Sequence, residues 1–248
     1  MLDLLPTPAV FAHRGASHYA PENTIAAFEL AVQQGADAIE LDVKLSADRK
    51  AVVIHDQTVD RTTNGRGQVN QLPLEELKKL DAGYRFAAYK GEKIPTLDEV
   101  FESAAKRVFI NVELTNYASR NDDLVSIVAE IVKKHNIQSN ILFSSFIPIN
   151  LQKARALLPE VPVGLLASRG LLGALSRSAY FIKLSPEIIH PYLTDVNQRF
   201  LETERKRGRR VHVWTVNEEA DMKRLFEMGV GGVFTDDPLK ALRILERK

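Results

Sequence analysis

Three acidic side chains share one side of two apolar, strand-like segments. In "ADAIELDVKL" the apolar residues occupy every second position, which leaves Glu40 and Asp42 together on the other side. In "RVFINVELT" the same alternation leaves Glu113 on that side. Three carboxylates that face one another inside a protein repel strongly, so a bound cation is the most economical explanation. Oxygen ligands alone favour a hard divalent ion, Mg²⁺ or Ca²⁺, with Mn²⁺ as a further candidate.

Two histidines and an arginine lie near the ends of neighbouring segments. The segment "AVFAH" ends at His13, which Arg14 follows, and "AVVIHD" places His55 on the connection after the second strand. Histidine side chains, whose ordinary pKa is ~6.5, can serve as general acid and base, and an arginine can bind an anion through two hydrogen bonds. With a bound cation, this set suits the cleavage of a phosphate ester. The alternative is a structural ion-pair network in which Arg14 and Lys44 neutralise the acids.

The strands that must position these residues alternate with helical patterns along the whole chain. We expect eight strands, at "AVFAH", "DAIELDV", "RVFINVEL", "NILFSS", "VPVGLLA", "AYFIKLS", "RVHVWTV" and "GGVFTD". Between them, apolar residues recur with a period of about 3.6, as in "ENTIAAFELAVQQG" and "NEEADMKRLFEMG". Thr96 and Glu99 form a capping-box pattern at the start of one such helix. This alternation favours an α/β fold, a (β/α)8 TIM barrel, over a doubly wound sheet, which the pattern alone leaves open.

Residues 57–95 interrupt the alternation. They contain the turn signals Asn64-Gly65 and Gly91, and a short helix is expected around Pro73 to Leu80. We interpret the segment as a small insertion after the second strand. Because the chain has no repeat, low-complexity tract or linker, residues 1–248 are expected to form a single barrel domain.

The composition excludes several classes of function. The 33 Lys and Arg residues balance the 32 Asp and Glu residues, so a nucleic-acid partner is not expected. The chain has no cysteine, which excludes disulfides and cysteine-ligated zinc. No run approaches the ~18 to 20 apolar residues that span a bilayer, so stable membrane insertion is not expected. The N-terminal segment lacks the pattern of a signal peptide, and we therefore expect a cytoplasmic protein.

Several short motifs, in a fixed order, resemble a known family. "HRG", "PENT", "ELD", "HD", "WTVN" and "TDDP" follow one another as they do in the glycerophosphodiester phosphodiesterases, and the resemblance covers nearly the whole chain. It implies a (β/α)8 barrel with a metal bound by the residues that match Glu40, Asp42 and Glu113. It also implies that His13 and His55 are the acid and base and that Arg14 contacts the phosphate.

The resemblance further implies a small-molecule substrate and a mechanism. Members of the family split glycerophosphodiesters into sn-glycerol 3-phosphate and an alcohol such as choline or ethanolamine. In a mechanism similar to theirs, the glycerol 2-hydroxyl attacks phosphorus to give a cyclic phosphate, which water then opens. The two histidines exchange the roles of acid and base between the two steps.

One position departs from the family pattern. Many members have a lysine two residues after the third acid, where it helps to bind phosphate, whereas this chain has Thr115. Strand parity in "AYFIKLS" directs Lys183 into the barrel, where it is a candidate replacement, and Lys44 is a second candidate. Trp214 is a further candidate substrate-binding residue, because its ring can form an apolar wall against the glycerol or the leaving group.

Other functions remain open beside the leading one. A lysophospholipase D on the same barrel stays open as an alternative because of Thr115 and the apolar segment near residues 165–175. A catalytically idle barrel that binds phosphodiesters predicts the loss of histidines or carboxylates, and none is lost. A glycosidase with paired carboxylates has no need of the two histidines or Arg14.

Overall fold

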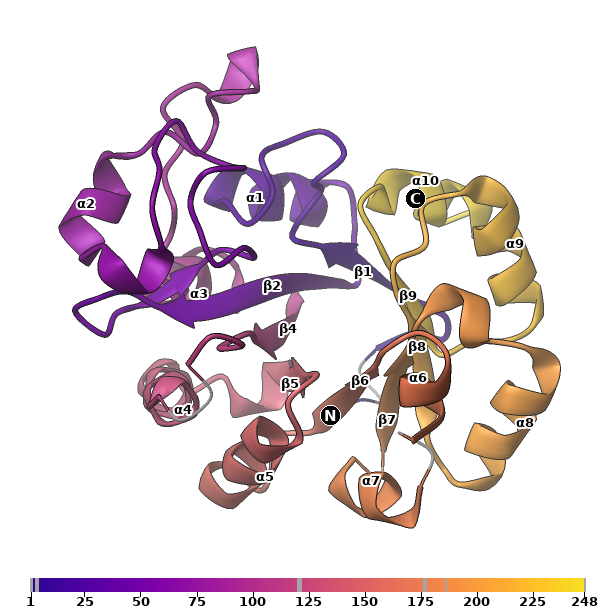
Figure 1. Cartoon of the computed structure of the whole chain (residues 1–248). Helices are drawn as coiled ribbons and strands as arrows, with labels where there is room; N and C mark the ends of the chain where they lie inside the picture. Colours follow the sequence, from indigo (N-terminus) through magenta and orange to yellow (C-terminus); the bar gives the residue numbers. More distant parts are fainter. Residues whose placement is uncertain (1, 3–4, 120–121, 176–177, 186, 248) are drawn as a thin grey trace.

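The strands close into a barrel. The computed structural model describes residues 2, 5–119, 122–175, 178–185 and 187–247. Within these residues nine strands form one sheet, in which every pairing between strands is parallel except that of β3 with β2. Pairing of β1 with both β2 and β9 closes the ring, so the predicted (β/α)8 barrel is confirmed (Figure 1). Its parallel strands are β1 (Ala9–His13), β2 (Ala38–Leu45), β4 (Phe109–Leu114), β5 (Ile141–Ser145), β6 (Val163–Ala167), β7 (Ile188–Pro191), β8 (Arg210–Val213) and β9 (Gly232–Thr235).

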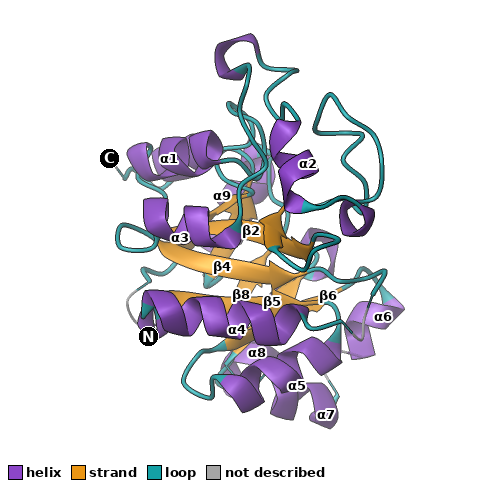
Figure 2. Ribbon diagram, turned by 90° about the vertical axis from the view of Figure 1, so that its left-hand side faces the viewer, coloured by secondary structure: helices purple, strands orange, loops and turns teal. Residues whose placement is uncertain are grey.

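Helices cover the outside of the barrel (Figure 2). Local sequence defines where several begin: the Thr24 hydroxyl accepts from the amide of Ala27, and Thr96 and Glu99 form the predicted capping box. None of the described helices is long and apolar enough to cross a membrane. The helices after the strands are α1 (Ile25–Gln33), α3 (Leu97–Ala104), α4 (Leu124–His135), α5 (Pro148–Leu157), α6 (Leu171–Leu175), α7 (Ala179–Leu184), α8 (Gln198–Lys206), α9 (Glu219–Glu227) and α10 (Pro238–Ile244).

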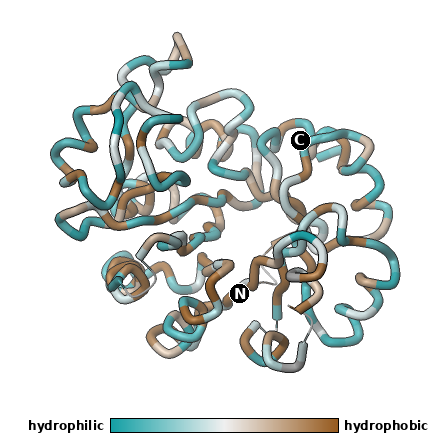
Figure 3. The backbone as a smooth tube through the Cα atoms, viewed as in Figure 1, coloured by the Kyte–Doolittle hydropathy of each residue, from teal (hydrophilic) through white to brown (hydrophobic). Residues whose placement is uncertain are grey.

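The alternation along β2 and β4 separates two environments. The apolar side chains of one parity, such as Ile39, Leu41 and Val112, are buried in the main hydrophobic core. The other parity faces the barrel interior, as the sequence predicted. Hydrophobic residues gather along the barrel strands, while the outer turns are more hydrophilic (Figure 3).

One predicted strand is wrong. The segment "AYFIKLS" forms helix α7, and the sixth strand of the barrel is instead β7, which begins four residues after the last residue of α7. The hydroxyl of Ser185 donates to the carbonyl oxygen of Val163 on β6 and accepts from the amide of Leu165. Ser185 thereby holds the end of α7 against β6, the strand with which β7 pairs. Ile188 and Ile189, both β-branched and fully buried, supply the strand.

Residues 57–95 extend from the second strand. A short strand, β3 (Ala51–Val53), runs antiparallel to the end of β2, and the chain then forms η2 (Val69–Gln71), α2 (Leu74–Lys79) and η3 (Ala87–Tyr89). The predicted short helix is therefore present. A small separate core lies beneath this insertion, formed by Val52, Ile54, Val59, Val69, Leu77, Ala82 and Ile94.

Candidate active site

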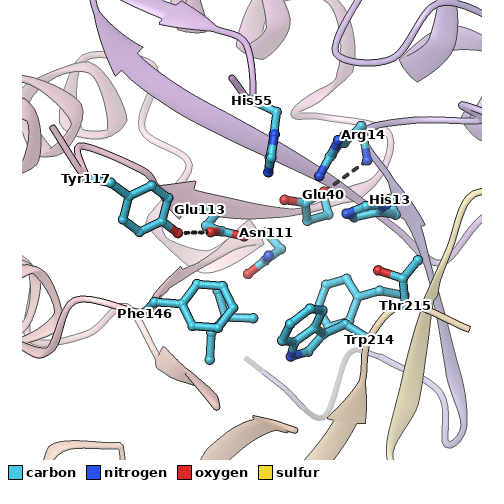
Figure 4. A pocket seen from close by; sticks show the side chains of 12 residues that line it. His13, Arg14, Glu40, His55, Asn111, Glu113, Tyr117, Phe146, Trp214 and Thr215 are labelled. Carbon is cyan, nitrogen blue, oxygen red and sulfur yellow. Dashed lines mark hydrogen bonds between the residues drawn. The ribbon is translucent and has the colours of Figure 1, made fainter. Parts of the chain in front are cut away.

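A cavity of about 210 Å³ opens at the carboxyl ends of the strands. Such ends form the catalytic face of this barrel type. Polar and charged residues line one part of the cavity and aromatic residues another (Figure 4). Its lining residues are His13, Arg14, Glu40, His55, Asn111, Glu113, Tyr117, Phe146, Leu166, Trp214, Thr215 and Phe234.

The three predicted carboxylates lie together. Glu40 and Asp42 are almost fully buried on β2, and strand register pairs Asp42 with Glu113 on β4. One oxygen atom from each carboxylate lies within 4.8 Å of the others. The prediction that these side chains share one face is confirmed.

The carboxylates repel one another. Burial, and then the charges of Asp42 and Glu113, raise the pKa of Glu40 well above its ordinary value. Burial and the charge of Asp42 also raise the pKa of Glu113, to about 8. Burial alone has the same effect on Asp42, but the charge of Arg14, together with smaller contributions from His55, Asn23 and His13, leaves the pKa of Asp42 below its ordinary value. The Oε1 atom of Glu40 is buried and has no hydrogen-bond partner. A cluster with these properties suits a cation with oxygen ligands.

Arg14 lies beside this cluster in a tight turn. Its Nε atom is 3.3 Å from Asp42 Oδ2, its backbone amide donates to Glu40 at 2.9 Å, and its Nη1 atom donates to Glu22 at 2.9 Å. The following Gly15 has φ of +84°, and a Cβ atom there would lie 2.7 Å from Ala27. The glycine of "HRG" is therefore required by the close approach of the chain to α1.

His13 is oriented across the seam of the barrel. Its Nδ1 atom lies 2.7 Å from Asp236 Oδ1, and Asn217 donates to the other oxygen of Asp236 at 2.6 Å. Burial favours a higher pKa for Asp236, but its hydrogen bonds, first that of His13, lower the pKa to about 2. Asp236 therefore stays ionised beside the imidazole.

His55 has a carboxylate partner from its own segment. Its Nδ1 atom lies 2.6 Å from Asp56 Oδ1, and Arg61 donates to the other oxygen of Asp56 at 2.6 Å. This hydrogen bond from Arg61 is the main reason that the pKa of Asp56 lies well below its ordinary value. Arg61 also donates two hydrogen bonds to Glu22, which in turn contacts Arg14.

Four of these supporting residues were not predicted from the sequence. They are Asp56 and Asp236, which the motifs "HD" and "TDDP" contain, and Arg61 and Asn217. The order of the motifs was the available signal for Asp236 and Asn217. The pairing itself depends on strand register between β1 and β9, which brings Ala12 opposite Thr235.

Comparison with known proteins identifies the family. The model of the glycerophosphoryl diester phosphodiesterase family matches residues 13–240. The chain belongs to this family. It is 39% identical over 240 residues to a glycerophosphodiester phosphodiesterase of Caldanaerobacter subterraneus subsp. tengcongensis, covering 96% of this chain and 98% of that protein. A lysophospholipase D of Homo sapiens is 31% identical, covering 92% of this chain and 83% of its own.

Solved structures agree with this assignment. An Oleispira antarctica phosphodiesterase in complex with the product sn-glycerol-3-phosphate superposes with a TM-score of 0.88 at 34% identity, covering 97% of each chain. A glycerophosphodiester phosphodiesterase of Agrobacterium tumefaciens has a TM-score of 0.80 at 32% identity, covering 94% of this chain and 99% of its own. As a member of the glycerophosphoryl diester phosphodiesterase family, the chain is an enzyme, a phosphoric diester hydrolase.

The two candidate replacements for the family lysine lie in different places. Lys183 is exposed on α7 and does not line the cavity, so the inference from strand parity that directed it inward is wrong. Lys44 is buried on β2, and its Nζ atom donates to the carbonyl and hydroxyl oxygens of Thr115 at 2.9 and 2.8 Å.

Aromatic residues form the apolar wall of the cavity. Phe146 and Trp214 pack edge to face, with ring centroids 5.3 Å apart. The indole Nε1 atom of Trp214 donates to the carbonyl oxygen of His190 at 2.8 Å, which fixes the ring. Trp214 thus lines the cavity as expected, opposite the polar residues (Figure 4).

Proposed function

We propose that the protein hydrolyses glycerophosphodiesters to sn-glycerol 3-phosphate and an alcohol, with a carboxylate-bound divalent cation and two histidines as acid and base. Family membership supports the reaction class. The product named for the Oleispira antarctica structure supports a small-molecule substrate of this kind. The observation that carries the proposal is a carboxylate cluster beside two histidines, each hydrogen-bonded to its own aspartate.

A divalent cation fits the cluster. Glu40, Asp42 and Glu113 would hold it through carboxylate oxygens, which suit Mg²⁺ or Ca²⁺ and, after these, Mn²⁺. The buried, unpartnered Oε1 atom of Glu40 supports this assignment. When bound, the ion neutralises the carboxylates and polarises a phosphoryl oxygen.

His13 and His55 are the proposed acid and base. Because an aspartate occupies the Nδ1 side of each ring, the Nε2 atom of each is left to exchange a proton with the substrate. One imidazole accepts the proton of the glycerol 2-hydroxyl as that oxygen attacks phosphorus, and the other donates a proton to the leaving alcohol. The roles reverse when water opens the cyclic phosphate.

Two further residues are proposed to bind the substrate. Arg14 is a ligand for the phosphate, because its guanidinium lines the cavity next to the carboxylates. Trp214 is a contact for the carbon atoms of the glycerol or the alcohol. Lys183 has no part in this proposal, since its side chain lies outside the cavity.

Release of glycerol 3-phosphate from glycerophosphocholine tests the proposal. The protein is assayed after chelation and again after addition of Mg²⁺, Ca²⁺ or Mn²⁺. We expect activity only with metal, and a loss of about 100-fold or more in His13→Ala and Glu40→Ala. His18→Ala, which removes an exposed histidine close to His13 in sequence, is the control and should retain activity. Full activity in the chelated enzyme or in His13→Ala contradicts the proposal.

A second candidate substrate is a lysophospholipid. Leu171 and Leu175 on α6 are 87% and 57% exposed, and α6 follows the strand that supplies Leu166 to the cavity. Exposed leucines in this position can contact an acyl chain that leaves the cavity. Replacing both with serine should lower activity on lysophosphatidylcholine and leave glycerophosphocholine hydrolysis unchanged. An equal effect on both substrates contradicts this assignment.

Other expectations stay predictions. A cytoplasmic location, the absence of a nucleic-acid partner and a single domain over residues 1–248 were inferred from composition and pattern alone. Fractionation of cells that express the protein tests the location directly.

A further inference from the structure

Lys44 is the one lysine that the described part of the chain buries, with 4% of its surface exposed. It lies on β2 two residues beyond Asp42, on the same side of the strand. Burial of an ammonium group is costly unless hydrogen bonds and opposite charges replace its hydration. A buried lysine beside a carboxylate cluster therefore indicates that its charge acts on the cluster.

The contacts of Lys44 fix its charge on one side of the cluster. Its Nζ atom donates two hydrogen bonds to Thr115, and it lies 5.6 Å from the centroid of the Tyr117 ring. The hydroxyl of Tyr117 donates to Glu113 at 2.6 Å. The lysine is thus linked to a carboxylate of the cluster through a single aromatic side chain.

The charges of Lys44 and the cluster act on each other. The carboxylates of Asp42 and Glu113 favour the charged form of the buried ammonium group of Lys44. The positive charge of Lys44 acts in turn on the carboxylate of Glu113. Lys44 does not line the cavity, so its influence on a ligand there is through charge.

We propose that Lys44 sets the net charge of the metal site, making it one unit less negative toward a bound cation and more attractive to a phosphodiester anion. This inference rests on the proposed metal-dependent function and adds a residue to it. A fixed positive charge repels a cation in proportion to the charge of that cation, and it attracts an anionic substrate. A side chain that only packs has neither effect.

Competition between Ca²⁺ and Tb³⁺ isolates the effect of charge. The two ions use the same kind of oxygen ligand, and binding of either displaces the same protons, so the ratio of their affinities reports the electrostatic potential. Tyr117, next to Glu113, provides an aromatic group through which Tb³⁺ luminescence can be excited. The measurement requires no substrate, so its result is independent of whether the hydrolytic function is correct.

The test uses Lys44→Gln, which removes the charge and keeps a donor for Thr115. We expect the preference for Tb³⁺ over Ca²⁺ to increase about tenfold, and the KM for glycerophosphocholine at saturating metal to rise by a similar factor. Lys50→Gln, which removes an exposed lysine at the end of the same hairpin, should change neither value. An unchanged ion preference in folded Lys44→Gln, checked by circular dichroism, overturns the proposal.

A charge exchange gives a second, independent test. In Lys44→Thr/Thr115→Lys the ammonium group originates from the residue that follows β4 instead of from β2. If the position of the charge matters and the identity of the residue that carries it does not, the ion preference and the KM should return to within about threefold of the wild-type values. Failure of the folded exchange variant to shift ion preference toward the wild-type value also overturns the proposal.

Discussion

Replacing Asp236 with asparagine should move the imidazole proton of His13 from Nδ1 to Nε2. The reason is that the neighbouring groups permit only one orientation of the new amide. Asn217 Oδ1 accepts from the backbone amide of Asp236 at 2.9 Å, so its Nδ2 group must face the Asp236 side chain, to which it donates at 2.6 Å. In Asp236→Asn, the oxygen of the new amide must accept this bond. Its NH2 group then faces the Nδ1 atom of His13, and the imidazole proton moves to Nε2.

The expected loss follows from two contributions. The hydrogen bond between Asp236 and His13 involves an ionised partner at 2.7 Å, and loss of such a bond costs ~1.5 to 3 kcal/mol, or about 10- to 100-fold in rate. Holding a catalytic imidazole in the wrong tautomer has a larger effect, which reaches about 10⁴-fold. We therefore expect kcat to fall by about 10³-fold, with a much smaller change in KM.

A second substitution that restores the tautomer of His13 should restore part of the activity. In Asp236→Asn/Asn217→Asp, the new carboxylate at position 217 accepts from the amide NH2 group, which turns the amide oxygen toward His13 and restores the original tautomer. We expect at least a tenfold recovery of kcat over Asp236→Asn, measured with glycerophosphocholine at saturating metal. Asn217→Asp alone places two carboxylates together and should be less active than wild type. Equal activity of the single Asp236→Asn and double variants refutes the reasoning.

Two further predictions concern the carboxylate cluster. Glu40→Gln should abolish activity. It should also raise the free energy of unfolding of the metal-free protein by about 1 to 2 kcal/mol, because it removes one of three carboxylates that repel one another. Urea unfolding in the presence of a chelator measures this change. The pKa of Glu113 is raised from 4.5 to about 8. Between these two pH values its carboxyl group is therefore protonated in the folded protein and ionised in the unfolded chain. The metal-free protein should therefore lose stability as pH rises through this interval, and added Mg²⁺ should oppose the loss; unchanged urea midpoints between pH 5 and pH 8 contradict this.

The positions of the three carboxylates could be predicted because β2 and β4 have a strict period of two. Parallel barrel strands bury one side against helices, so a polar residue at every second position can only face the interior. Ile39 and Leu41 on one side, and Glu40 and Asp42 on the other, leave no second register. The acids of the site therefore followed from local pattern once the barrel was expected.

The sixth barrel strand, β7, could not be predicted in the same way. Six residues of "AYFIKL" fit both a period of two and the helical period, and "IIHP" is too short to show any period. Tertiary contacts decide between them, since Ser185 ends α7 against β6 and positions the buried Ile188 and Ile189. The wrong direction predicted for Lys183 has the same cause. Strand parity placed its side chain inside the barrel, and this inference does not apply to a residue of a helix.

The two histidines depend on different parts of the fold. His13 and Asp236 are 223 residues apart and meet only because β1 pairs with β9, so no local pattern contains their contact. His55 and Asp56 are adjacent in sequence, and Arg61 connects Asp56 with the rest of the site.

This difference has a functional consequence. The chain of ion pairs from Asp56 through Arg61 and Glu22 ends at Arg14, so the position of His55 is coupled to the group proposed to bind phosphate. The side chain of His13 instead pairs with Asp236 across the β1–β9 seam, so its orientation depends on barrel closure. Loss of Arg61 should therefore disturb both substrate binding and the proton transfers of His55, whereas a change at the β1–β9 seam should disturb the proton transfers of His13.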